Sequence, residues 1–178
     1  MTPNPLKKPI CIAFAGMVGT SKTPIATFLS WNLALPIFSN DAIRSEIHED
    51  TRSKILDQEL FVRTRDDRLK KIVNNRTDFI LDASVDRKWK NVKQLLSDSD
   101  YKWFVISVDL TKQFVRELYQ YKEYANTMSQ IDKLYTEHDE FLKSYSNDVT
   151  LTINNNNFSN RMEICLSEVK KFINSMRP

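Results

Sequence analysis

Residues 10–23 read ICIAFAGMVGTSKT, in which an apolar run leads to two glycines and then to the pair Lys22–Thr23. The stretch nearly fits the Walker A spacing G-x-x-x-x-G-K-[ST], with Ser21 where the second glycine would stand. Such a loop offers backbone N–H groups to phosphate oxygens, an ammonium to the β and γ phosphates, and a hydroxyl to Mg²⁺. The alternative is an ordinary strand–turn–helix corner with a surface lysine. The nucleotide-binding interpretation predicts that ATP and Mg²⁺ bind to Gly16, Met17, Val18, Gly19, Thr20, Ser21, Lys22 and Thr23.

The sequence on either side of this loop supports the nucleotide-binding interpretation. The run before the loop is apolar like a buried strand, and a helical pattern follows it, so that the positive end of a helix dipole would face the phosphates. The only two glycines of the chain, Gly16 and Gly19, both lie in the loop. Because glycine makes up about 7% of average proteins, this placement indicates that backbone freedom is needed there above all.

The composition of the 178-residue chain, 41% apolar and 28% charged, is typical of one globular domain, predicted to span residues 1–178. No apolar run approaches the roughly 18 residues of a membrane-spanning helix. The apolar residues before the loop read as a core strand rather than as a signal peptide. Cys11 and Cys165 show no disulfide or metal spacing, which fits reduced thiols in the cytoplasm. We therefore expect a cytoplasmic protein without a membrane partner.

The net charge of +3 is too small to indicate a nucleic-acid-binding protein. Charge is nonetheless uneven, because residues 63–76 (RTRDDRLKKIVNNR) carry six basic side chains against two acidic ones. This segment is either a solvated helix face or a surface that receives an anionic substrate. His138 lies on an apolar helical face, where we expect a packed core histidine rather than a catalytic one.

Short apolar runs alternate with helical patterns along the chain. Each run is rich in Ile, Val and Phe and nearly continuous in hydrophobicity, as in strands that are covered on both faces. Strands that alternate with helices predict an α/β fold with a parallel sheet. The predicted strands are 9–14, 35–39, 78–83, 102–110 and 149–153. The predicted helices are 23–33, 41–49 with a capping Asn40 or Asp41, 55–75, 86–97, one that begins at a capping Thr111, one that begins at a Thr127–Gln130 capping box, and a last one with apolar positions from Phe158 to Ile173.

Polar residues follow several of these strands. Ligands of open parallel sheets bind beyond the carboxyl ends of the strands, where this sequence has Asn40, Asp41, Asp82 and Asp109. Asp82 and Asp109 each close an apolar run, so either is a candidate for a carboxylate that holds Mg²⁺. Helical spacing places Arg44 on the same side of its helix as Asp41.

The segments GMVGTSKT, FSNDAIRSEI and FILDAS together resemble P-loop small kinases of the polynucleotide-kinase and AAA-type ATP-binding group. Zeta-toxin, chloramphenicol phosphotransferase and gluconate kinases are more distant relatives, and the resemblance covers nearly the whole chain. It implies a three-layer α/β/α fold with a five-stranded parallel sheet in the order 2-3-1-4-5 and a lid near residues 111–146. It also implies an ATP-dependent kinase that transfers the γ-phosphate to a hydroxyl of a small molecule or of a nucleic-acid end.

The resemblance implies roles for two residues after the second predicted strand. Asp41 corresponds to an aspartate that acts as general base on the acceptor hydroxyl, which a carboxylate near the phosphate-binding loop can do. Arg44 corresponds to an arginine that contacts the substrate or orders the site. The alternatives are a helix N-cap for Asp41 and a salt bridge to Glu46 or Glu49 for Arg44.

Other residues are expected to stabilise charge during transfer. The resemblance favours Asp82 over Asp109 as the carboxylate that, with Thr23, holds Mg²⁺. Lys22 would stabilise the transferring phosphoryl group together with an arginine of the lid. Related lids carry several arginines, whereas here Arg116 is either the arginine that contacts the phosphoryl group or a helix-surface charge.

Two residues depart from the pattern of these kinases. Ser21 costs on the order of 1 kcal/mol if its backbone needs a positive φ. Pro24 has no N–H to donate to the α-phosphate, and losing such a hydrogen bond costs roughly 1–3 kcal/mol. Tyr119, Tyr121 and Tyr124 either stack on the adenine base or pack the lid. A second hypothesis is therefore a nucleotide-binding module with weak or no phosphotransfer, such as a sensor or partner-binding protein. A third is a structural protein with a vestigial loop.

Overall fold

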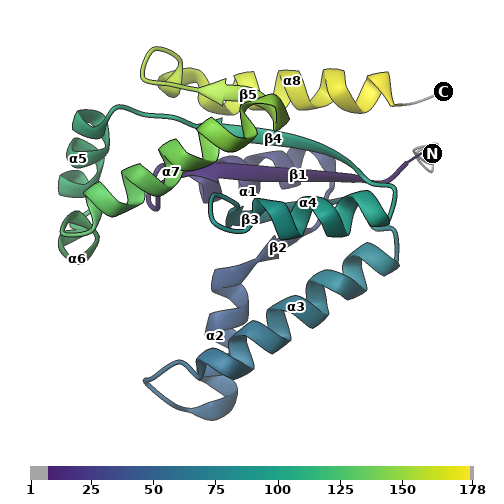
Figure 1. Ribbon diagram of the computed structural model, residues 1–178, viewed down its shortest axis with the longest axis horizontal. Helices are drawn as coiled ribbons and strands as arrows, with labels where there is room; N and C mark the ends of the chain where they lie inside the picture. Colours follow the sequence, from purple (N-terminus) through teal and green to yellow (C-terminus); the bar gives the residue numbers. More distant parts are fainter. Residues whose placement is uncertain (1–7, 177–178) are drawn as a thin grey trace.

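The computed structural model describes residues 8–176, which form one parallel sheet with helices on both of its faces (Figure 1). The order of the strands is β2-β3-β1-β4-β5, and the neighbouring strands pair in parallel. This confirms the predicted five-stranded sheet and its order. The strands are β1 (Ile10–Gly16), β2 (Ile37–Ser39), β3 (Phe79–Ser84), β4 (Lys102–Val108) and β5 (Val149–Ile153).

Helices connect the strands, as the alternation of the sequence predicts, and the lid region expected near residues 111–146 is helical. The α-helices are α1 (Lys22–Leu33), α2 (Asn40–Thr51), α3 (Gln58–Asn74), α4 (Trp89–Asp98), α5 (Lys112–Tyr121), α6 (Ala125–Met128), α7 (Ile131–Tyr145) and α8 (Arg161–Ser175). Two short 3-10 helices, η1 (Ser146–Asp148) and η2 (Phe158–Asn160), flank β5.

Strand β1 lies at the centre of the three layers, and all of its residues are buried. Its side chains point alternately into two cores, so Ile12 and Phe14 belong to one and Cys11 and Ala13 to the other. The first core contains residues of α1 and α8, and the second contains residues of α3, α4 and α7. Because both faces of the strand are covered, its apolar run is uninterrupted. The predicted three-layer arrangement is confirmed.

The residues predicted to cap two of the helices do not cap them. The Ser39 hydroxyl caps α2 by accepting from the N–H of Ala42, so neither Asn40 nor Asp41 is the cap. The predicted Thr127–Gln130 capping box does not form, because Thr127 lies inside the separate short helix α6 and α7 begins only at Ile131.

Helix α4 begins at Trp89 rather than at Asp86. The Asp86 carboxylate is engaged with the backbone of the loop after β1. Among residues 8–176, no helix is both long and apolar enough to cross a membrane.

Candidate active site

The loop after β1 adopts the strained backbone that its sequence predicts. Gly16 and Gly19 have φ of 130° and 78°, and Ser21 has φ of 71°. A Cβ atom on Gly16 would lie 2.7 Å from the carbonyl oxygen of Val108, and one on Gly19 would lie 2.9 Å from the ring of Tyr119. Both glycines are therefore required by conformation and by space. The expectation that Ser21 needs a positive φ is confirmed.

We expect Ser21→Gly to raise the free energy of unfolding by about 0.5–1 kcal/mol. Glycine removes the strain of a left-handed backbone, and the greater conformational entropy that it gives to the unfolded chain offsets part of this gain. Ser45→Gly, in an exposed position of α2, should instead destabilise by about 0.5 kcal/mol. Urea denaturation of both variants measures the two effects. A loss of stability in Ser21→Gly would show that the strain at this position is not real.

Lys22 is buried within the loop instead of pointing into solvent. Its Nζ donates to the carbonyl oxygens of Gly16, at 2.7 Å, and of Met17, and lies 3.5 Å from the hydroxyl of Thr20. Burial lowers the pKa of Lys22 to about 8, against the opposing effect of nearby Asp86. The loop thus encloses the ammonium of Lys22. Phosphate oxygens of a bound ligand would replace the two carbonyl oxygens as its hydrogen-bond acceptors.

The other loop residues are arranged around this lysine. Met17 and Thr20 are buried, and the Thr20 hydroxyl donates to the Met17 carbonyl at 2.8 Å. Val18 is exposed, and Thr23 and Pro24 are exposed in the first turn of α1.

Thr23 contacts the carboxylate that the sequence favours for Mg²⁺. Its hydroxyl donates to Asp82 at 3.0 Å. Burial raises the pKa of Asp82, the hydrogen bond from Thr23 opposes this rise, and the nearby charge of Asp41 adds to it. Asp109 lies elsewhere, 3.9 Å from the Nε2 atom of His138. The structure thus brings Thr23, Asp82 and Asp41 together at one edge of the sheet and leaves Asp109 apart.

A hydroxyl and a carboxylate fit a bound Mg²⁺, which prefers oxygen ligands and often takes one or two carboxylates together with substrate phosphates and waters. In the part of the chain that the structure describes, no group of three or more His, Cys, Asp or Glu side chains could hold a metal by itself. Any Mg²⁺ at Thr23 and Asp82 therefore needs phosphate oxygens and waters for the rest of its coordination.

Asp41 and Arg44 form an ion pair with each other on the exposed side of α2. The alternative role for Arg44, a salt bridge to Glu46 or Glu49, is not found among the described residues, and Glu46 pairs with Arg68 of α3 instead. The Arg44 guanidinium also lies over the ring of Phe61, 4.8 Å from its centroid. Asp41 is thus held one turn from an arginine, and it is free of the capping role that was its alternative.

Sequence reasoning missed Asp86, which anchors the start of the loop. Its carboxylate accepts the backbone N–H of Gly16 at 3.0 Å and lies 3.2 Å from Nδ1 of His138. The Asp86 side chain is only 8% exposed, and His138 is buried and stacks on Phe141. His138 is therefore a packed core histidine, as expected, but it packs against the carboxylate that holds the loop. No local signal of sequence connects residues that lie 70 positions apart.

We expect Asp86→Ala to lower the free energy of unfolding by about 2–3 kcal/mol, because the N–H of Gly16 and the imidazole of His138 both lose a buried partner. Asp67→Ala, at an exposed position of α3, should change it by less than about 0.5 kcal/mol. Chemical denaturation provides the comparison. Equal, small losses in the two variants would contradict an anchoring role for Asp86.

Helix α5 and the residue that follows it pack directly onto the loop. The hydroxyl of Tyr119 donates to the Val18 carbonyl at 2.6 Å, and Nζ of Lys122 donates to the Gly19 carbonyl at 2.7 Å. Tyr119 is buried and the ring of Tyr124 lies 6.0 Å from it, centroid to centroid. Of the two alternatives for these tyrosines, this contact matches the packing role.

Two arginines and the remaining lid tyrosine complete this region. Tyr121 and Arg116 are exposed on α5. Arg161, which sequence reasoning missed, lies at the start of α8 with its guanidinium 4.2 Å from the ring centroid of Phe158. Its Nε atom is buried and has no hydrogen-bond partner among the described residues. Burial lowers the pKa of Lys122, and the charge of Arg161 adds to this, so the two cations are neighbours beside the loop.

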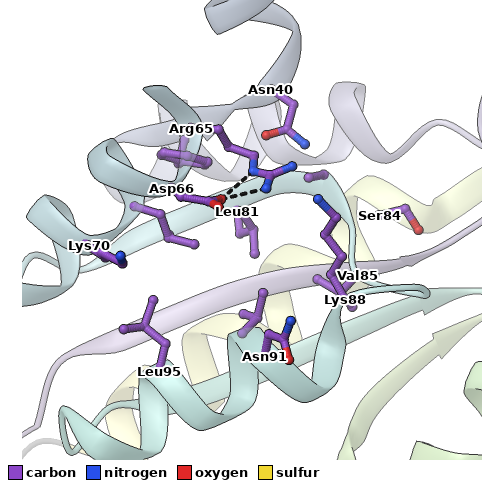
Figure 2. A pocket seen from close by; sticks show the side chains of 14 residues that line it. Asn40, Arg65, Asp66, Lys70, Leu81, Ser84, Val85, Lys88, Asn91 and Leu95 are labelled. Carbon is purple, nitrogen blue, oxygen red and sulfur yellow. Dashed lines mark hydrogen bonds and ion pairs between the residues drawn. The ribbon is translucent and has the colours of Figure 1, made fainter. Parts of the chain in front are cut away.

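A cavity of about 310 Å³ opens beside the same edge of the sheet (Figure 2). The Ser84 hydroxyl at its border donates to the Gly16 carbonyl at 3.0 Å, and Asn40, the neighbour of Asp41, lines it from α2. The cavity therefore lies between α3 and α4, over the end of β3, with Ser84 and Asn40 on its border toward the loop and α2. Its apolar lining consists of Phe38, Leu69, Leu81, Ala83, Val85, Val92 and Leu95.

Solved structures of other proteins share the fold of this chain. No protein-family model and no curated protein sequence matches the chain. A protein from Chloroflexus aurantiacus that is named a kinase has a TM-score of 0.64 at 14% identity, over 95% of this chain and 98% of that one. A gluconokinase from Sinorhizobium meliloti has a TM-score of 0.63 at 12% identity, over 94% and 95%. The chain has the fold of the P-loop kinases.

An APS kinase from Mycobacterium tuberculosis, solved with AMPPNP and APS, has the same fold, with a TM-score of 0.57 at 12% identity over 92% of this chain and 98% of that one. The resemblance read from the sequence is thus confirmed at the level of the fold. Residues 16–23 lie at the end of the first strand of this fold and at the start of its first helix.

Proposed function

We propose that the protein is an ATP-dependent kinase that transfers the γ-phosphate of ATP to a hydroxyl group. The observation that carries this proposal is the hydrogen bond between Thr23 and Asp82 beside a loop that encloses the ammonium of Lys22. A hydroxyl, a carboxylate and a cation in this arrangement match the needs of a magnesium-bound triphosphate. The kinases of the same fold support the choice of phosphotransfer.

In this proposal each side chain has one task. The backbone N–H groups of residues 16–23 bind the β-phosphate, and Lys22 neutralises the β and γ phosphates. Thr23 and Asp82 would hold Mg²⁺, which would supply positive charge to neutralise the negative charge that develops on the phosphate groups. As the oxygen of the acceptor hydroxyl attacks the γ-phosphorus, Asp41 takes the proton of that hydroxyl. The bond from that phosphorus to the β–γ bridging oxygen breaks, and ADP leaves with the electron pair.

The lid and the substrate contact are further parts of the proposal. Arg44, paired with Asp41, would orient the acceptor. Arg116 is exposed and therefore available to reach the transferring group, with a helix-surface charge as the alternative. The prediction that residues 1–178 act as one domain, with residues 111–146 as its lid, belongs to this account.

The second candidate function is nucleotide binding with weak or no transfer. Pro24 favours it, because the residue after Thr23 offers no N–H to the α-phosphate. The small number of lid arginines favours it as well. In either function the loop binds ATP and Mg²⁺.

Two measurements separate these functions. A thermal-shift titration with ATP and Mg²⁺ should raise the melting temperature, and γ-phosphate transfer to a panel of hydroxyl acceptors should follow. Binding without transfer to any acceptor would support the binding module. The absence of any shift with ATP would leave a vestigial loop.

A further inference from the structure

The cavity beside Asn40 has more positive charge than its lining neutralises. Three cations line it, Arg65 and Lys70 from α3 and Lys88 from the segment before α4, against the single carboxylate of Asp66 (Figure 2). That carboxylate is already engaged, because Nε and one terminal nitrogen of Arg65 donate to the same Asp66 oxygen at 2.7 and 2.6 Å. The side chains that line the cavity therefore leave positive charge that an anionic ligand would neutralise.

Two of these cations, the largely buried Arg65 and the more exposed Lys88, face each other across the cavity. In Figure 2, the ammonium of Lys88 points toward the guanidinium of Arg65, whose side chain is only 13% exposed. Burial lowers the pKa of Lys88, and the charge of Arg65 lowers it further. An anionic group between the two would relieve this repulsion and accept hydrogen bonds from the Lys88 ammonium and from the terminal N–H groups of Arg65 that Asp66 does not engage.

A polar atom at the border of the cavity is left without a partner. The Oδ1 atom of Asn40 is buried and accepts no hydrogen bond among the described residues. Buried acceptors are normally satisfied, so a hydroxyl or amide N–H of a ligand is the partner that this position fits. Asn40 directly precedes Asp41, the proposed base, and this places a ligand hydroxyl next to the site of transfer.

We propose that the phosphoryl acceptor is a small organic anion, a carboxylate or phosphate monoester on a largely apolar skeleton, with its anionic group on Arg65 and Lys88 and its reactive hydroxyl beside Asn40 and Asp41. This inference rests on the proposed kinase function and names its acceptor class. The basic segment 63–76 is then partly functional, since Arg65 and Lys70 line the cavity while Arg68 pairs with Glu46.

The size of the cavity favours a small acceptor over the end of a nucleic acid. A volume of about 310 Å³ lies at the lower limit of small-molecule pockets and corresponds to roughly ten water molecules in the liquid. The apolar lining favours a compact hydrocarbon body over stacked bases, and the lining residues include no aromatic side chain except Phe38.

Two readouts with the intact protein test the proposal. The first is the thermal shift of the ATP-free protein with small hydroxy acids and sugar monophosphates, each compared with its methyl ester or with the dephosphorylated sugar. The second is γ-phosphate transfer to the same compounds and to 5′-hydroxyl oligonucleotides. We expect the anions to stabilise the protein and to accept phosphate at least about tenfold better than their neutral counterparts. Carboxylates and phosphates form separate arms, so the preferred anion is identified.

Lys88→Met should raise the KM of the best anionic acceptor about tenfold, reduce the thermal shift that this anion produces, and reduce the preference for the anion over its neutral counterpart. Lys90→Met, at an exposed position of α4, is the matched control and should change none of these. A best acceptor that is neutral or an oligonucleotide, or a Lys88→Met variant that keeps the original KM, would overturn the acceptor class and leave the kinase intact. Anions that stabilise the protein, with no transfer to any compound of the panel, would overturn both the acceptor class and the kinase and leave only an anion-binding cavity. If no compound stabilised the protein or received phosphate, both the kinase function and the acceptor class would be refuted.

Discussion

Asp41→Asn should lower the rate of γ-phosphate transfer by about two to four orders of magnitude. The asparagine has nearly the same shape and can still hydrogen-bond the acceptor hydroxyl, but it cannot take its proton. Because Asp41 is exposed and does not cap α2, the substitution should leave the fold and ATP binding intact. The effect should therefore appear in kcat, with the KM of ATP within about twofold of the parent value.

The control for this prediction lies on the same helix. Asp50→Asn removes an equally exposed carboxylate of α2 and should leave kcat unchanged. Initial rates of product formation at saturating ATP measure both variants. If Asp41→Asn transferred phosphate as fast as Asp50→Asn, the general base would have to be another group.

Lys22→Met should reduce phosphate transfer by about two to three orders of magnitude, the loss expected when one preorganised donor to a developing charge is removed. The same change should leave the stability of the ATP-free protein at neutral pH within about 1 kcal/mol of the parent value, because removing a buried ammonium with a lowered pKa offsets the loss of its hydrogen bonds to the Gly16 and Met17 carbonyls. Thermal denaturation and single-turnover assays measure the two effects. A variant that lost both stability and activity would indicate a structural lysine.

The pKa of about 8 for Lys22 also fixes a pH dependence. In the ATP-free protein this pKa is lower than the ordinary 10.5. The unfolded chain therefore binds more protons between pH 8 and 10.5, and Lys22 makes the folded state more stable as pH rises through that window. Phosphate favours the charged form, so ATP affinity should fall as pH rises above about 8, by up to about tenfold per pH unit.

Lys22→Arg separates this effect from other titrations. Its guanidinium stays charged throughout this range, so its ATP affinity, although lower, should be flat between about pH 7 and 9. Isothermal titration calorimetry at several pH values gives both curves. Parallel curves would assign the pH dependence to another group.

Most of the fold was predictable because buried parallel strands leave a strong local signal. Each predicted strand overlaps the observed one. The signal is strongest in β1, whose residues are all buried and whose apolar run is uninterrupted. Helix starts were less predictable. Ser39, Asn40 and Asp41 are all good caps, and only the end of β2 at Ser39 decides among them.

The candidate site was predictable where a residue's neighbours in sequence define its task. The loop of residues 16–23 and the carboxylate at the end of β3 carry such local patterns. The anchoring of Gly16 by Asp86 does not, because it depends on the register of β1 against β3 and on the packing of α7. The contacts of Tyr119 and Lys122 with the loop likewise arise only when α5 folds back onto it.

The charge of the α3 segment shows the same limit. Its sequence indicated an excess of cations but not which of them face a cavity, since that depends on how α3 lies against α4 and β3. In the structure, Arg68 is neutralised by Glu46 while Arg65 and Lys70 line the cavity.

The central claim is that residues 16–23 enclose a triphosphate. A crystal structure with a non-hydrolysable ATP analogue and Mg²⁺ tests it most directly. We expect the β-phosphate within the loop, the Nζ atom of Lys22 turned from the Gly16 carbonyl to phosphate oxygens at about 2.8 Å, and Mg²⁺ beside Thr23 and Asp82. A loop that stays empty at saturating analogue, with Lys22 still bound to the Gly16 carbonyl, would contradict the account.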